Sequence, residues 1–383
     1  MPTLNLTQRL ERLIALPSVS SVNPDWDQSN AGVIEELEDW FRDAGFRTEV
    51  LPIAGHADKY NLIATLGDGD DGLVLSGHTD TVPFNASRWQ TDPFKLSERD
   101  GRLHGLGVID MKSFFALILE ALRPLDGRRP RHPLVVIATA DEESNMCGAQ
   151  ALLDLHRRLG RHAIIGEPTG ARPIRMHKGI GMESIRLTGK SGHSSDPSLG
   201  VNALDGMYQV IGEVIAWRDE LAGRLRNPAF DIPYTTVNLG HVHGGDNPNR
   251  ICADCELQID IRPLPGMTLP ELRAELRQRL QRRLADSGLA LTFEPLFGGI
   301  EAVETPAESA IVRAVEAATG HPAASAAYGT EAPYLNRMGM DTVIFGPGDI
   351  DQAHQPDEYL ALERITPYVG QLRALIEQFC FRD

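Results

Sequence analysis

Short apolar runs that lead into charged or imidazole side chains recur along the chain. The runs 73–75, 134–138 and 163–165 contain only Leu, Val, Ile and Ala, and residues 342–345 form a similar run near the end. Unbroken apolar runs of this length, bounded by polar residues, are typical of strands buried on both faces of a parallel sheet. The pattern therefore predicts a buried sheet with polar chemistry at the ends of its strands.

Stretches with apolar residues at helical spacing lie between these runs. The segment AGVIEELEDWF at 31–41 shows this spacing, and Gly45 is a stop signal shortly after it. We predict helices at 4–15, 31–44, 114–122, 307–319, 332–339 and 362–379, and further strands at 47–53 and 60–66. Because strands alternate with helices through residue 170, the sheet is expected to be largely parallel.

The pattern changes in the middle of the chain. MESIRLTG alternates polar and apolar positions, a long helix is predicted at 202–224, and strands are predicted at 234–242 and 251–262. A charged helix, LPELRAELRQRLQRRLADSG, and the strand LALTFEP follow. This favours an inserted α+β domain with an antiparallel sheet. The expected fold is α/β, with a catalytic domain formed by 1–178 and 293–383 and an insert at 179–292.

Composition and charge exclude several classes of protein. The chain has 383 residues, long for one core, and its 53 acidic and 37 basic side chains give a formal charge of −16. Nucleic acid and anionic membrane surfaces both attract basic patches, so neither is an expected partner. No apolar run approaches the roughly 20 residues that span a bilayer, and no signal-peptide pattern opens the chain. We expect a cytoplasmic protein.

Cys252 and Cys255 form the only C-x-x-C motif. Neither a second Cys pair nor a His pair follows at zinc-site spacing. The surrounding ICADCELQIDIR alternates like a strand, and residues three apart on a strand point to opposite faces. We therefore interpret both as strand cysteines, with a metal site as the alternative.

Five residues occupy corresponding positions at strand ends or helix starts: His78, Asp110, Glu143, Glu167 and His354. The carboxyl ends of parallel strands gather at one edge of an open sheet, where ligands bind. Two imidazoles and three carboxylates suit a pair of divalent metal ions, and one of the adjacent Glu142 and Glu143 could instead face an attacking water. Asp80 could hold the second ring nitrogen of His78. Taken singly, Asp110 could be a helix N-cap, and Glu167 or His354 could be structural.

Six segments carry a resemblance to a known family: SGHTDTVP, GLGVIDMK, ATADEES, IIGEPTG, SGHSSDP and AHQPDEY. Together they resemble the M20 family of metal-dependent aminoacyl hydrolases, and the similarity extends over nearly the whole chain. The resemblance implies a zinc-peptidase-like catalytic domain and an inserted dimerisation lid. It also implies two divalent ions, zinc or alternatively cobalt, with His78 and Glu167 on one, Glu143 and His354 on the other, and Asp110 bridging. Glu142 would be the general base, and Asp80 would orient His78.

The resemblance extends to residues outside this cluster. His193 corresponds to a histidine that reaches into the partner subunit's site and helps to hold the oxyanion, although it could be a turn histidine. Asn249 and Arg262 correspond to positions that hold the substrate carboxylate, although Arg262 could form a surface ion pair. Thr330 and Glu331 lie in a GTEAP segment that the family places at the substrate pocket. We expect the carboxylate of Glu331 to pair with the distal ammonium of a substrate derived from ornithine.

The expected function is hydrolysis of a small N-acyl amino acid by a homodimer. Within the family, the resemblance is to enzymes that remove acetate from N-acetyl-L-ornithine in arginine biosynthesis. Succinyl-diaminopimelate and N-acetylmethionine remain alternative substrates of the same chemistry. A non-catalytic binding protein on this scaffold would be favoured by a broken set of metal ligands, and none of the expected residues is missing.

Overall fold

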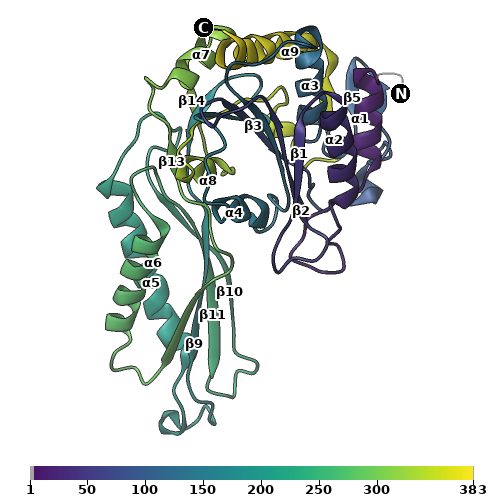
Figure 1. The fold of residues 1–383 in the computed structure, drawn as a ribbon. Coiled ribbons are helices and arrows are strands. Elements are labelled where there is room, and N and C mark those ends of the chain that lie inside the picture. The colour runs from purple at the N-terminus through teal and green to yellow at the C-terminus, as the bar shows by residue number, and fades with distance from the viewer. Residues whose placement is uncertain (1–3, 383) are drawn as a thin grey trace. The chain divides into compact units, whose positions relative to one another are not determined.

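The computed structural model describes residues 4–382, which fall into two compact units (Figure 1). The first unit comprises the chain up to Arg175, Thr305–Ala324 and the chain from Thr330 onward, and the second comprises Met176–Glu304 and Ser325–Gly329. The chain therefore changes unit at 175/176, 304/305, 324/325 and 329/330, whereas the sequence prediction placed the insert at 179–292. Among the described helices, none combines the length and the apolar character needed to cross a membrane.

The main sheet is mixed, and its parallel centre lies in the first unit. Its strands, in spatial order, are β1 (Arg47–Pro52), β2 (Tyr60–Leu66), β6 (Leu134–Thr139), β3 (Leu73–His78), β7 (His162–Ile165), β15 (Asp341–Ile344), β8 (Ile174–His177) and β13 (Val303–Glu304), and β14 (Ala324–Ala326) also pairs with β8. Strands β6, β3, β7 and β15 run parallel, and the flanking pairs are antiparallel. Every residue of β3, β6 and β7 is buried, as their unbroken apolar runs predict.

Helices cover both faces of this sheet, with α3 and α9 on one face and α4 and α8 on the other (Figure 1). The helices of the unit are α1 (Leu6–Ala15), α2 (Ala31–Asp43), α3 (Ser113–Leu122), α4 (Cys147–Leu153), α7 (Ala310–Thr319), α8 (Ala332–Arg337) and α9 (Leu362–Ile376), which continues into a π turn at Glu377–Phe381. Helix α3 is apolar nearly all round, and its buried phenylalanines Phe114 and Phe115 belong to the main core. It is buried on nearly all sides because α1 and α9 pack against it.

A small sheet, missed by the sequence prediction, lies beside the first. It contains β4 (Ser97–Arg99), β5 (Arg102–His104) and β16 (Tyr359–Ala361), in the order β16-β5-β4. Strands of three residues are too short to show a period of two, so the pattern gave no signal for them. Their pairing brings the chain after residue 358 next to the chain before residue 105, which matters for the site below.

The second unit contains an antiparallel sheet in the order β10-β11-β9-β12. Its elements are β9 (Gly181–Thr188), α5 (Ala203–Arg224), β10 (Thr236–Gly244), β11 (Asp254–Arg262), α6 (Leu269–Arg283) and β12 (Ala290–Pro295). Burial alternates along β9 and β11, because one face of the sheet packs against the apolar faces of α5 and α6. The predicted antiparallel α+β organisation is therefore present.

The two cysteines of the C-x-x-C motif correct one sequence argument. Cys255 lies on β11, but Cys252 precedes the strand, so the two-face alternation does not apply to the pair. Both are free and buried, and the thiol of Cys252 donates to the carbonyl oxygen of Asp254 at 3.1 Å. Neither belongs to a group of possible metal ligands in the described chain.

Candidate metal centre

The four parallel strands deliver most of the predicted residues to one edge of the main sheet. Strand β3 ends at His78, β6 leads directly into the turn with Glu142 and Glu143, and β7 leads to Glu167. The loop after β15 carries His354. Parallel neighbours end on the same side, so residues far apart in sequence converge there.

Asp110 joins this group from the turn before α3. The helix begins at Ser113 with Lys112 at the N-cap position, so Asp110 is not the helix cap that the sequence left open. One carboxylate oxygen, Oδ1, lies 3.1 Å from Nε2 of His78, and the other, Oδ2, lies 3.3 Å from Nε2 of His354. One carboxylate therefore contacts both imidazoles.

Two further carboxylates complete the groups around these imidazoles. Oε1 of Glu167 lies 3.6 Å from Nε2 of His78, and Oε1 of Glu143 lies 3.0 Å from Nε2 of His354. The donor atoms of His78, Asp110 and Glu143 all lie within 4.8 Å of one another, as do those of His78, Glu142 and Glu167. The structure thus brings all five predicted ligands and Glu142 into one cluster.

Asp80 contacts both His78 and the turn that carries Glu142 and Glu143. Its backbone oxygen lies 3.0 Å from Nδ1 of His78, while its side-chain Oδ1 is 3.6 Å from that nitrogen. The carboxylate also accepts hydrogen bonds from the backbone N–H groups of Glu142 at 3.2 Å and Glu143 at 3.0 Å. Asp80 therefore fixes the turn with both glutamates, a contact that the sequence did not reveal.

The electrostatics of the cluster favour bound cations. Burial raises the pKa values of both Glu142 and Glu143. The neighbouring carboxylate of Glu167 raises the pKa of Glu142 further, and that of Asp110 raises the pKa of Glu143 further. Burial opposes a charge on His78, yet hydrogen bonds to Asp110 and Asp80 raise its pKa well above the ordinary value. Hydrogen bonds to Asp110 and Glu143 raise the pKa of His354 to about 10. The raised pKa values mean that protons held by these groups offset part of the negative charge of the carboxylates. Bound metal cations would offset the same charge.

The donor set fits two divalent ions. Imidazole nitrogens and carboxylate oxygens are ligands that zinc accepts, and the two oxygens of Asp110 point to different imidazoles. A third group, His56, Asp141 and Cys147, fits less well, because Asp141 already pairs with the ammonium of Lys59 at 2.6 Å. Among the residues of the first unit that the structure describes, one cluster is therefore suited to a metal pair.

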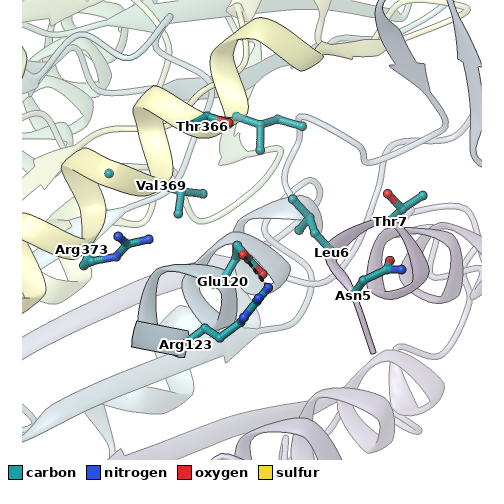
Figure 2. A pocket seen from close by; sticks show the side chains of 10 residues that line it. Asn5, Leu6, Thr7, Glu120, Arg123, Thr366, Val369 and Arg373 are labelled. Atoms are coloured by element: carbon teal, nitrogen blue, oxygen red, sulfur yellow. Dashed lines mark hydrogen bonds and ion pairs between the residues drawn. The ribbon is translucent and has the colours of Figure 1, made fainter. Parts of the chain in front are cut away.

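A separate cavity of about 490 Å³ lies between the start of α1, the end of α3 and α9 (Figure 2). Its charged side chains Glu120 and Arg123 pair with each other at 3.2 Å, and Nε of Arg373 donates to the carbonyl oxygen of Ala121. No group of possible metal ligands in residues 4–382 includes a residue of its lining. The cavity therefore lacks the chemistry that the strand ends carry.

Three predicted residues belong to the second unit. His193 and Asn249 lie on adjacent segments, because the N–H of Ser194 donates to the carbonyl oxygen of Asn249 at 3.1 Å. Nδ1 of His193 accepts from the backbone N–H of Ser195 at 3.2 Å and lies 2.7 Å from its hydroxyl oxygen, an arrangement that favours the tautomer with its proton on Nε2. Nε of Arg262 donates to Asp260 at 2.9 Å, so part of its guanidinium is already engaged.

Thr330 and Glu331 stand at the start of α8 in the first unit, and both are buried. The hydroxyl of Thr330 accepts from the N–H of Ala332 at 3.1 Å, which is a local helix-start contact. Glu331 makes no side-chain cap, and its Oε1 has no hydrogen-bond partner within the described residues. Burial raises the pKa of Glu331 to about 7, against a hydrogen bond with Thr139.

Lys59 lies beside the site, and no pattern in the sequence pointed to it. It is 4% exposed, and its ammonium donates to Asp141 at 2.6 Å, to Asp27 at 2.8 Å and to the carbonyl oxygen of Gln28. Asp141 has a φ of +55° at the start of the Glu142–Glu143 turn. The lysine therefore anchors that turn, but a lone lysine before an ordinary strand carries no sequence signal.

Known proteins are similar to this chain in sequence and in fold. Residues 74–378 match the model of peptidase family M20/M25/M40. The chain belongs to this family. It is 48% identical over 373 residues to an acetylornithine deacetylase of Pasteurella multocida (strain Pm70), covering 97% of both chains. It is also 48% identical over 370 residues to one of Edwardsiella ictaluri (strain 93-146), covering 97% of this chain and 96% of that one.

Solved structures share the fold. The crystal structure of the aminopeptidase PepT from Bacillus cereus ATCC 10987 superposes with a TM-score of 0.77 at 21% identity, covering 98% of each chain. The M20 match spans all the clustered residues from His78 to His354. The mixed α/β fold with a mostly parallel central sheet and a separate antiparallel sheet, as predicted, is thus the fold of this family.

Proposed function

We propose that this M20 protein is a metal-dependent amidohydrolase that converts N-acetyl-L-ornithine to L-ornithine and acetate. The observation that carries the metal chemistry is the contact of the two Asp110 oxygens with His78 and His354, at 3.1 and 3.3 Å. The 48% identity to two acetylornithine deacetylases supports the choice of substrate.

His78 and Glu167 would hold one divalent ion, Glu143 and His354 the other, and Asp110 would bridge them. Zinc is our first choice, with cobalt as the alternative, because both accept imidazole and carboxylate donors. Bound there, the ions would supply the Lewis acid that polarises the amide carbonyl and lowers the pKa of the attacking water. Asp80 keeps the backbone of the glutamate turn in place through the two N–H groups that it accepts.

Glu142 is the residue that we assign as general base. Its carboxylate lies in the same group as His78 and Glu167, and its backbone is held by Asp80. From this position it can take a proton from the attacking water and deliver it to the leaving nitrogen of ornithine. Transfer of the proton to nitrogen lets the C–N bond break with an amine, instead of an amide anion, as the leaving group.

Residues of the second unit would complete the site in a homodimer. The protonated Nε2 of His193 is suited to donate to the developing oxyanion of the partner subunit's substrate. Asn249 and Arg262 would hold the substrate α-carboxylate, with the guanidinium as the charged partner. Thr330, already at the start of α8, would line the pocket beside Glu331.

The function is tested by comparing the hydrolysis of N-acetyl-L-ornithine, N-succinyl-diaminopimelate and N-acetylmethionine by zinc- and cobalt-loaded protein. We expect the highest kcat/KM for N-acetyl-L-ornithine. Faster hydrolysis of another substrate would retain the amidohydrolase chemistry and overturn the named substrate. If metal-loaded protein hydrolysed none of the three, the assignment as a deacetylase would be wrong.

Replacing Glu331 with glutamine should selectively impair hydrolysis of N-acetyl-L-ornithine. Glu331 is 1% exposed, and the charges of His78, Asp80 and Glu142 act on it, which places it near the cluster. Loss of a buried charge pair with the distal ammonium costs about 2 kcal/mol or more, equivalent to a loss of kcat/KM of about 30-fold. N-Acetylmethionine, which lacks the ammonium, is the matched control substrate. Equal losses on both substrates would contradict the assignment.

Replacing Tyr208 with glutamate should convert a homodimer to a monomer. Leu204, Tyr208 and Ile215 are 45%, 81% and 36% exposed along α5, and β10 is an edge strand with Val242 56% exposed. An apolar helix face near an open strand edge is typical of an interface. Sedimentation velocity should give twice the 42.0 kDa chain mass for the unmodified protein. Arg218→Glu, a charge change further along α5, should leave the dimer intact, and a monomeric unmodified protein would refute the interface.

A further inference from the structure

Glu358 is a buried carboxylate that the chemistry above does not use. It is 2% exposed and immediately precedes β16, four residues after His354. Its Oε2 accepts from the N–H of Gly107 at 3.0 Å. Its Oε1 accepts from the N–H groups of Ile109 at 2.8 Å and Asp110 at 3.2 Å. Every hydrogen bond of this side chain thus goes to the backbone that presents Asp110.

The 107–110 segment needs such an acceptor. It belongs to neither a helix nor a strand, so no regular ladder satisfies its N–H groups. Gly107 has a φ of +80°, and an added Cβ there would come within 2.7 Å of a methyl group of Thr81. The segment is therefore packed tightly on one side, and the Glu358 carboxylate fixes it by hydrogen bonds on another.

The loop that carries Glu358 is itself anchored. Oδ1 of Asp357 accepts from the N–H groups of Gln90 at 2.9 Å and Thr91 at 3.0 Å, and the hydroxyl of Thr91 donates to it as well. The pairing of Tyr359 with His104 continues this attachment along β16. The side chain of His354, in contrast, is 53% exposed, and its ring contacts the carboxylates of Asp110 and Glu143. Asp357 and Glu358 thus form the fixed base of the exposed His354 loop.

We propose that Glu358 is a positioning residue of the metal centre. Its carboxylate links the Asp110 backbone to the base of the His354 loop. It thereby sets the distance between the proposed bridging ligand Asp110 and the proposed terminal ligand His354, which are 244 positions apart in the sequence. This inference rests on the proposed metal centre. It does not depend on the identity of the substrate.

The chemistry of the contact identifies informative substitutions. Both carboxylate oxygens accept hydrogen bonds from N–H donors, so glutamine would turn an NH₂ group towards a backbone N–H and leave at least one donor unpaired. Aspartate keeps two acceptor oxygens on a side chain shorter by one methylene. Glu358→Gln should therefore disturb the Asp110 segment more than Glu358→Asp.

The experiment measures Co²⁺ binding to the full chain by calorimetry and by visible absorption of the cobalt-loaded protein. For Glu358→Gln we expect affinity for at least one ion to fall about 10–100-fold, with a changed cobalt spectrum, as for loss of a group that orients a ligand. Glu358→Asp should restore part of the affinity and of the spectrum. The matched control is Glu183→Gln, which removes a buried carboxylate paired with Arg273 at 2.6 Å on β9 and should lower thermal stability while leaving cobalt binding unchanged.

Lower thermal stability of Glu358→Gln with cobalt affinity and spectrum unchanged would overturn the proposal, because Glu358 would then only support the fold. If Glu358→Gln does not fold, Glu358→Asp decides, with reduced affinity supporting the proposal and unchanged affinity refuting it. If Glu358→Gln alters cobalt binding but the unmodified protein does not hydrolyse N-acetyl-L-ornithine, the positioning role stands and the proposed substrate is rejected. The two failures are thereby distinguished.

Discussion

Glu142→Gln should lower kcat for N-acetyl-L-ornithine by about 10²–10⁴-fold, the usual contribution of a general base. Glutamine preserves the size of the side chain and the backbone N–H bond to Asp80, but it cannot take a proton from water. Because the five expected metal ligands are untouched, both ions should remain bound and KM should change little. Steady-state kinetics together with metal analysis of the same preparation measures this.

Two outcomes would contradict the assignment of Glu142. An unchanged kcat would place the base elsewhere, and loss of a metal ion would make Glu142 a ligand, which its grouping with His78 and Glu167 also permits. Glu98→Gln, on the small strand β4 and exposed, serves as the control that should retain full activity. The metal content thus separates proton transfer from coordination.

Removing the metal ions, or replacing Asp110 with asparagine, should abolish turnover. Asparagine offers one oxygen and no negative charge where the carboxylate contacts both His78 and His354. Its effect on metal affinity should exceed the roughly 10–100-fold loss typical of groups that only orient ligands. Dialysis against a chelator should give inactive protein that added zinc or cobalt reactivates. Activity that survives complete metal removal would refute the proposed chemistry.

The metal-free protein should also lose stability as pH rises. Burial and like charges raise the folded-state pKa values of Glu142 and Glu167, so the folded chain binds protons more tightly than the unfolded chain. The free energy of unfolding therefore falls as pH rises above about 4.3, the ordinary glutamate value. The raised pKa of His354, about 10, adds a loss of the same sign above the ordinary histidine value of about 6.5.

Urea unfolding of chelated and metal-loaded protein at about pH 6 and about pH 8 tests this dependence. The chelated protein should be less stable at the higher pH, and bound metal should reduce the difference, because the cations replace the protons as counter-charges. Equal pH dependence with and without metal would mean that these carboxylates are compensated by something other than the ions.

The sequence by itself determined the buried strands and the residues at their ends. Unbroken apolar runs can be satisfied only by burial on both faces, which defined β3, β6 and β7, and the polar residues after them follow directly along the chain. Alternation likewise predicted β9 and β11, because one face packs on helices and the other does not. These are local consequences of where apolar side chains can go.

Only the tertiary structure decided which atoms meet. The two Asp110 oxygens reach different imidazoles, and the Asp80 carboxylate accepts from the backbone of the glutamate turn as well as lying 3.6 Å from the His78 ring. Lys59 matters because it contacts Asp141, which lies 82 positions away in the sequence. Glu358 matters because it contacts the backbone of Asp110, which lies 248 positions away. Hydrogen bonds over such separations leave no periodic signal in a sequence, because they depend on how the completed sheet and its loops bring distant backbone together.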